Sequence, residues 1–115
     1  MPGPAGRVPA MADFALLTHR QGDMLTAIVR GELDAASAPE LQAVVSDALG
    51  AGVIDVLIDC RGLHLADSRG IGALLAARAA LTERGGSLVL FGPPDNVRRA
   101  LDVTGLVDSF LVVDA

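Results

Sequence analysis

The chain has 115 residues, the length of one small domain. Its net charge of −5 argues against nucleic acid as a partner, because that binding needs a basic surface. The only aromatic residues are three phenylalanines, so the chain has no aromatic platform on which bases could stack. All nine basic residues are arginine, which excludes the lysine chemistry of Schiff bases and P-loops.

Residues 1–12 are rich in proline and glycine and are expected to form a disordered tail before one domain of residues 13–115. The tail lacks the apolar stretch of a signal peptide, and Met11 is an alternative start. No apolar run approaches the about 20 residues that span a bilayer. The single Cys60 cannot form an internal disulfide, which fits a reducing compartment. A cytoplasmic protein without membrane contact is therefore predicted.

The first elements form a hairpin and a helix. Residues 13–20 and 24–30 are predicted to pair across a glycine-containing turn, and residues 31–34 to form a loop. A helix is then expected to begin at Ser37, with Glu40 completing a capping box. Its apolar stripe consists of Leu41, Val44, Val45, Ala48 and Leu49, and it ends at Gly50 and Gly52.

The middle of the chain contains the most apolar predicted strand. Residues 53–60 are apolar apart from Asp55 and Asp59, which indicates a central strand covered by helices on both faces. Residues 61–65 are expected to connect this strand to a helix that runs to Arg84. The residues of that helix predicted to face inward are Ile71, Leu74, Leu75 and Leu81.

The remaining elements repeat the strand-helix alternation. Residues 87–91 and 110–113 are predicted strands, and Asp95 is the predicted N-cap of a helix that ends at Gly105. The order β-β-α-β-α-β-α-β predicts an α/β fold with a mixed, mainly parallel sheet and helices packed on it. The inner face of the last helix is predicted to consist of Val97, Ala100, Leu101 and Thr104.

The step Asp67-Ser68-Arg69-Gly70 lies where the central strand gives way to a helix. Ser68 suits the N-cap position, and a hydroxyl at a helix N-terminus is exposed in a place where negative charge is tolerated. The step alone leaves two interpretations open, a helix cap only and a modification site. Gly70 and Gly72 allow another backbone, from a strand or a partner, to approach the first turn.

Other chemistry-bearing residues have weaker patterns. Asp55, Asp59 and Asp67 lie near one strand, but their spacing does not require a shared enzymatic or metal site. His19 and His64 lack metal-ligand spacing, and Cys60 is expected to be a buried, inert thiol. The fragment Gly70-Ile71-Gly72 is not a complete phosphate-binding loop, and the pair Arg98-Arg99 is expected to be solvated surface. These patterns predict no catalytic residue, metal or cofactor.

Six short segments, in this order, resemble the STAS domain family, and specifically its small stand-alone anti-sigma factor antagonists. The resemblance extends over residues 13–114, and the combination of motifs is more specific than any one of them. The segments are residues 30–34 (RGELD), 58–63 (IDCRGL), 65–72 (LADSRGIG), 85–90 (GGSLVL), 97–101 (VRRAL) and 104–106 (TGL). One position departs from the family pattern: Arg69 stands where the phosphorylation motif usually has a second Ser or Thr.

The resemblance implies partner switching by a protein that is not an enzyme. An anti-sigma factor that is also a serine kinase would bind this chain and release a sigma factor. It would later phosphorylate Ser68 and dissociate, and a PP2C-type phosphatase would reverse the modification. Arg69 would place a cation beside the phosphate. The chain is expected to be a monomer or weak dimer, with a partner surface formed by Glu32, Leu33, Asp34, Asp67, Ser68, Arg69, Gly70, Ile71 and Gly72.

Two alternatives remain. A non-switching STAS subunit would scaffold a transporter or a stress-signalling assembly, and a transport operon beside the gene would favour it. A nucleotide-binding module or small hydrolase would be stabilised by its ligand against heat, although the absent lysine and Walker pattern count against it.

Overall fold

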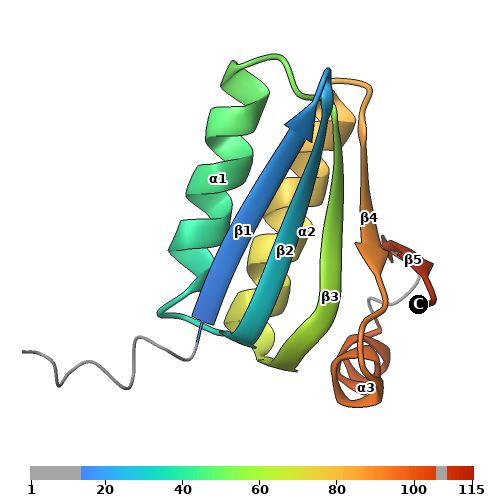
Figure 1. Cartoon of the computed structure of the whole chain (residues 1–115). Coiled ribbons are helices and arrows are strands. Elements are labelled where there is room, and N and C mark those ends of the chain that lie inside the picture. Colours follow the sequence, from blue (N-terminus) through green and yellow to red (C-terminus); the bar gives the residue numbers. More distant parts are fainter. Residues whose placement is uncertain (1–13, 106–108) are drawn as a thin grey trace, which may run out of the picture.

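The computed structural model describes residues 14–105 and 109–115, which form a sheet with three helices (Figure 1). The predicted tail of residues 1–12, Asp13 and Leu106 lie outside the described residues. The observed order matches the predicted α/β alternation. The elements are β1 (Phe14–Gln21), β2 (Met24–Leu33), α1 (Ala38–Gly50), β3 (Asp55–Ala66), α2 (Ser68–Glu83), β4 (Ser87–Phe91), α3 (Asp95–Val103) and β5 (Leu111–Val113).

The sheet has the order β1-β2-β3-β4-β5. The hairpin β1-β2 is antiparallel, and every other pair is parallel, which confirms the predicted mixed and mainly parallel sheet. Each parallel pair is joined through a helix, because parallel strands require a crossover connection. In the described part of the chain, no helix is long and apolar enough to cross a membrane.

Strands β2 and β3 extend further than their sequences predicted. The expected break at Gly31 is wrong, because β2 continues to Leu33, and the expected connection over residues 61–65 belongs to β3. The two strands stay paired through two register shifts, one of them beside Gly31, whose φ of +95° suits a bulge. Their far ends, Leu33 and Ala66, therefore pair directly.

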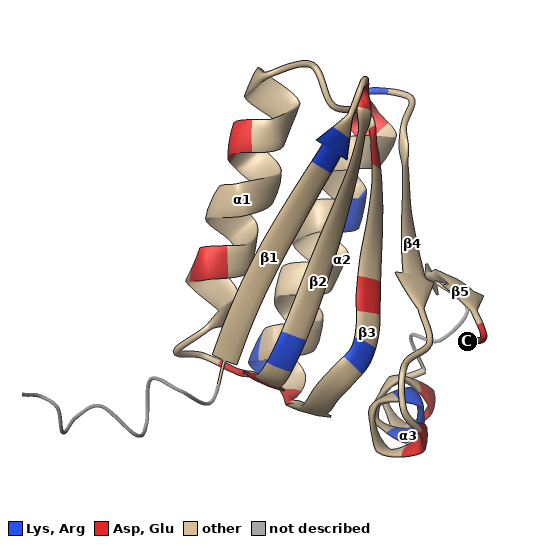
Figure 2. Ribbon diagram, in the orientation of Figure 1, with Lys and Arg blue, Asp and Glu red and all other residues tan. Residues whose placement is uncertain are grey.

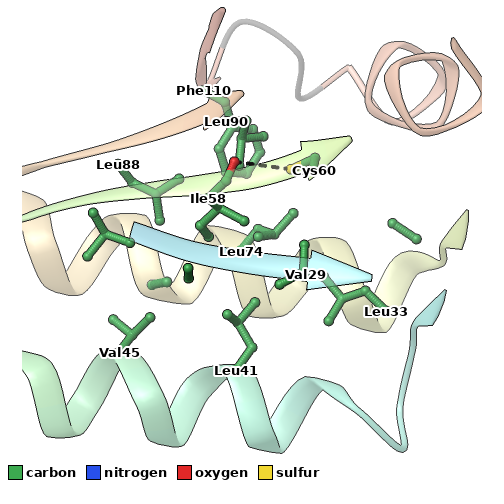
Figure 3. Packing of buried hydrophobic residues seen from close by; sticks show 14 of the residues in the cluster. Val29, Leu33, Leu41, Val45, Ile58, Cys60, Leu74, Leu88, Leu90 and Phe110 are labelled. Atoms are coloured by element: carbon green, nitrogen blue, oxygen red, sulfur yellow. Dashed lines mark hydrogen bonds between the residues drawn. The ribbon is translucent and has the colours of Figure 1, made fainter. Parts of the chain in front are cut away.

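The core lies between one face of the sheet and helices α1 and α2 (Figures 1 and 3). The expectation that helices cover both faces of β3 is wrong. Val56, Ile58 and Cys60 are buried towards the helices, whereas Leu57 on the opposite face is half-buried; Asp59, on that same opposite face, is buried in an ion pair with Arg61. Figure 3 shows Leu41 and Val45 of α1 beneath strand β2, and Leu74 of α2 between β2 and β3 in this view. The largest fully buried side chains on these elements include Val29, Leu33, Leu41, Ile58 and Leu74.

Two helix caps also differ from the prediction. Ser37 precedes α1, but its side chain makes no cap hydrogen bond, so the predicted capping box is wrong. Its hydroxyl is used in the preceding loop instead. Asp95 is the first residue of α3, and Pro94 occupies the cap position. Thr104 is exposed beyond the end of α3 rather than on its inner face, and its hydroxyl donates within the last turn.

Candidate functional site

The two segments predicted to form the partner surface lie side by side at one end of the sheet (Figure 1). Glu32 and Leu33 end β2, and they pair with Leu65 and Ala66 at the end of β3. The backbone N–H of Asp67 then donates to the carbonyl of Leu33 at 3.1 Å. The start of α2 is thus attached to the end of β2, although the two are more than thirty residues apart in sequence.

A hydrogen-bond network holds the loop after β2. The carboxylate of Asp34 accepts from the N–H groups of Ala36 at 3.0 Å and Ser37 at 3.2 Å. The hydroxyl of Ser37 donates to the carbonyl of Glu32 at 2.7 Å and accepts from the N–H of Asp34 at 2.9 Å. Ser37 is buried, and this network uses its hydroxyl fully. The segment from Glu32 to Ser37 is therefore a fixed edge of the site.

The N-cap of α2 is Asp67, so the prediction that Ser68 is the cap is wrong. Asp67 has extended backbone angles, and its carboxylate accepts from the N–H of Gly70 at 2.9 Å. Ser68 is the first helical residue and is exposed. No hydrogen bond of the Ser68 hydroxyl occurs among residues 14–105 and 109–115. The helix start is capped without Ser68, which leaves its hydroxyl accessible.

The glycines of the first turn have different surroundings. A Cβ on Gly70 would lie 2.1 Å from the carbonyl oxygen of Leu33, so this glycine allows the close approach that the sequence suggested. A Cβ on Gly72 would meet nothing within 4 Å. Ile71 is buried in the core, whereas Arg69 is exposed. Ser68, Arg69 and Gly72 therefore form the outward surface, and the residues between them hold the helix in place.

The charges of the site are mixed, and Figure 2 shows acidic residues in red where β2 ends and α2 begins. The carboxylates weighed in the sequence have separate structural partners. Asp55 accepts from the Ser87 N–H at 3.0 Å. Asp59 accepts from the Arg61 guanidinium at 2.8 Å, and that hydrogen bond holds the pKa of Asp59 below its usual value. No three His, Cys, Asp or Glu side chains within the described ranges are grouped as a metal site.

Cys60 is a buried thiol, as predicted, and it is 1% exposed. Burial raises its pKa to about 12, so the thiol stays protonated at neutral pH. Its Sγ contacts the carbonyl of Ile58 at 3.5 Å (Figure 3). Because the reactive nucleophile is the thiolate, a protonated and enclosed thiol is a poor nucleophile.

Arg99 is the residue near Ser68 that the sequence did not reveal. The pair Arg98-Arg99 was expected to be solvated surface, and both lie at the surface: Arg99 is exposed, and Arg98 donates to the exposed Asp114 at 2.5 Å. Arg99 lies on α3 and lines the same depression as Ser68. The helical spacing of Asn96, Arg99 and Val103 places them on one face of α3, but it cannot show which other element that face adjoins.

We expect Asp67→Ala to lower the free energy of unfolding by about 1 kcal/mol, because it removes the capping acceptor of Gly70 N–H. Asp67→Asn retains an acceptor and is expected to lower the free energy of unfolding by less than Asp67→Ala does. Asp95→Ala is a matched control, since Asp95 lies in the first turn of α3 and is not its N-cap. Urea unfolding followed by circular dichroism measures all three. Equal stabilities of Asp67→Ala and the wild type would contradict the assigned cap.

Comparison with known proteins matches this arrangement to one family. The STAS domain model matches residues 15–115. The chain is 33% identical to an anti-sigma-B factor antagonist of Listeria monocytogenes. The aligned residues make up 80% of this chain and 81% of the relative. The chain is 31% identical to one from Staphylococcus aureus, covering 70% and 74%.

Solved structures show the same fold. The anti-sigma factor antagonist SpoIIAA in its unphosphorylated form has a TM-score of 0.78 at 24% identity, covering 88% of both chains. An anti-sigma factor antagonist from Mycobacterium paratuberculosis has a TM-score of 0.77 at 22% identity, covering 89% of this chain and 86% of that one. Since the family model spans nearly the whole chain and two antagonists are 31% and 33% identical to it over 70% and 80% of its length, this chain belongs to the STAS domain family, among the anti-sigma factor antagonists.

Proposed function

We propose that this protein is a cytoplasmic partner-switching antagonist, regulated by phosphorylation of Ser68. In the unmodified state it binds an anti-sigma factor that is also a serine kinase, and the bound sigma factor is released. The kinase transfers a phosphoryl group from ATP to Ser68, and the complex dissociates. A PP2C-type phosphatase restores the binding form. The protein acts as a monomer or weak dimer and carries no catalytic residue, metal or cofactor of its own.

The observation that carries the proposal is the accessible hydroxyl of Ser68. Asp67 accepts the hydrogen bond of the first turn, so modification of Ser68 removes no capping interaction. Ser68 is exposed at the first position of α2, where the helix dipole favours negative charge. The free protein therefore tolerates a phosphate at this position. The phosphate is unfavourable only for the binding of a partner that packs against it.

The penalty in a complex is electrostatic. A phosphate adds about −1.5 to −2 charge. Asp67 is adjacent, and Glu32 and Asp34 lie on the neighbouring edge of the site. Burying the added charge against a partner removes its hydration, and like charges disfavour the same arrangement. A loss of about 3 kcal/mol corresponds to roughly a hundredfold weaker binding.

Relatives support the proposal. The Listeria and Staphylococcus relatives are named anti-sigma-B factor antagonists. SpoIIAA of Bacillus has been solved in unphosphorylated and phosphorylated forms, and the phosphorylated form has a TM-score of 0.72 to this chain. A phosphorylated state is thus compatible with this fold.

The kinase reaction tests the assignment of Ser68. Proteins that co-purify with the wild type, but not with Ser68→Asp, identify the partner. That partner is then incubated with the wild-type chain, ATP and Mg²⁺, and peptide mass spectrometry locates the phosphate. We expect one phosphate on the peptide that contains Ser68 and none on Ser68→Ala. Phosphate found only on another residue would contradict the proposal.

A non-switching scaffold is the second candidate. A sulfate transporter family protein of Wolinella succinogenes has a TM-score of 0.72 at 21% identity, covering 84% of this chain and 80% of that one, so the fold also occurs in that setting. A scaffold binds its partner equally well whether position 68 carries the native serine or a negative charge. The Ser68 variants therefore separate the two candidates.

A further inference from the structure

A depression of about 370 Å³ lies between the start of α2 and the last helix, α3. Asp67 and Ser68 line it on one side. Asn96, Arg99, Val103 and Thr104 line it on the other. The predicted modification site therefore adjoins α3, although about thirty residues separate them in the chain.

Arg99 is the basic residue of this depression. Within the described ranges its guanidinium makes no hydrogen bond or ion pair, in contrast to Arg98, which pairs with Asp114. Arg69 follows Ser68 directly in sequence but does not line the depression. The other charged group in the lining is Asp67, whose carboxylate already accepts from Gly70 N–H. A second anion placed here therefore has Arg99 as its available cation.

Asn96 connects this face of α3 to the sheet. Its side-chain amide donates to the carbonyl of His64 in β3. Val97 and Leu101 bury the opposite face of the helix in the core. Arg99 therefore lies on a helix that is attached both to the sheet and to the core. The backbone from which its side chain extends into the depression is held in place.

We propose that Arg99 receives the phosphate of phosphorylated Ser68 as an intramolecular ion pair across this depression. The inference rests on the proposed function, since it takes Ser68 as the modified residue. A guanidinium donates charge-assisted hydrogen bonds to phosphate oxygens, often two in parallel. The pair stabilises the modified, free form of the protein and joins α2 to α3. Phosphorylation then acts by closing the depression as well as by adding charge.

The experiment uses the full chain with phosphoserine incorporated at position 68 during translation, so no kinase is needed. Phosphorus NMR follows the second ionisation of the phosphate, which in unconstrained phosphoserine has a pKa of about 6. A nearby cation favours the dianion and lowers that pKa. Arg99→Gln is therefore expected to raise the pH midpoint of this phosphate titration by about half a unit. Arg98→Gln is the matched control. It and Arg69→Gln are expected to leave the titration midpoint unchanged.

A second readout is the thermal midpoint, compared with and without the phosphate in each background. The phosphate is expected to raise the midpoint more in the wild type and in Arg98→Gln than in Arg99→Gln. The unphosphorylated variants check that each substitution leaves the fold intact. An Arg99→Gln titration identical to the wild type would overturn the proposal, as would a shift caused by Arg69→Gln instead. A kinase that modifies another residue would refute the proposed function. The titration would still show whether Arg99 pairs with a phosphate at position 68, because it uses phosphoserine introduced without a kinase.

Discussion

Ser68→Asp is expected to bind the anti-sigma partner about a hundredfold more weakly than the wild type, a loss of about 3 kcal/mol. The new carboxylate lies on an exposed first-turn position next to Asp67, so a partner covering it must bury two neighbouring anions. Ser68→Ala is expected to bind as tightly as the unmodified wild type, because Ser68 caps nothing. It should also stay bound after ATP is added. Isothermal titration calorimetry with the purified partner measures these affinities.

The matched control for this experiment is Ser46→Asp. Ser46 is also an exposed helical serine, but it lies within α1 rather than at the start of α2. We expect its affinity for the partner to stay within about twofold of the wild type, since an exposed charge away from the interface has a small effect. If Ser68→Asp and Ser46→Asp bind equally well, the partner does not cover the start of α2, and the switching mechanism is wrong.

Gly70→Ala is expected to lower the free energy of unfolding by about 2–3 kcal/mol. The added methyl group would lie 2.1 Å from the carbonyl oxygen of Leu33 and 2.8 Å from its carbonyl carbon. Both atoms are backbone, so they cannot move aside as a flexible side chain would. The start of α2 must shift away from β2, which strains the hydrogen bond between Asp67 N–H and the Leu33 carbonyl.

Gly72→Ala is the matched control, because it changes the same residue type in the same helix. Its Cβ would meet nothing within 4 Å, and alanine is favoured over glycine in a helix by about 1 kcal/mol. We expect Gly72→Ala to be as stable as the wild type or slightly more stable. Urea unfolding compares the two variants. Equal effects of both would show that helix propensity, and not the contact with Leu33, decides the cost at Gly70.

The alternation of strands and helices follows from short-range patterns. The stripe of Leu41, Val45 and Leu49 predicts α1, and all three side chains are buried as expected. Glycines at turns mark the ends of helices α1, α2 and α3. These patterns involve residues within one or two turns of each other, so the amino-acid sequence suffices to find them.

The lengths of β2 and β3 depend on each other, and for that reason neither was predicted correctly. Gly31 and Gly62 are poor strand residues on local propensity. The two strands nevertheless continue past both glycines, because each supplies backbone hydrogen bonds to the other through the register shifts. Pairing between distant segments outweighs local preference, and it places Glu32 and Leu33 next to the start of α2.

The sequence alone was enough to find the family motif and the close approach that Gly70 permits, and it made Ser68 a candidate modification site. The tertiary structure decided which neighbour caps the helix and which arginine lines the same depression as Ser68. Asp67 and Ser68 are both good N-cap residues, and the choice depends on where β3 ends. Arg99 and Ser68 line one depression because α3 and the start of α2 both border it. Such contacts arise from the packing of separate elements, and sequence periodicity within one element cannot reveal them.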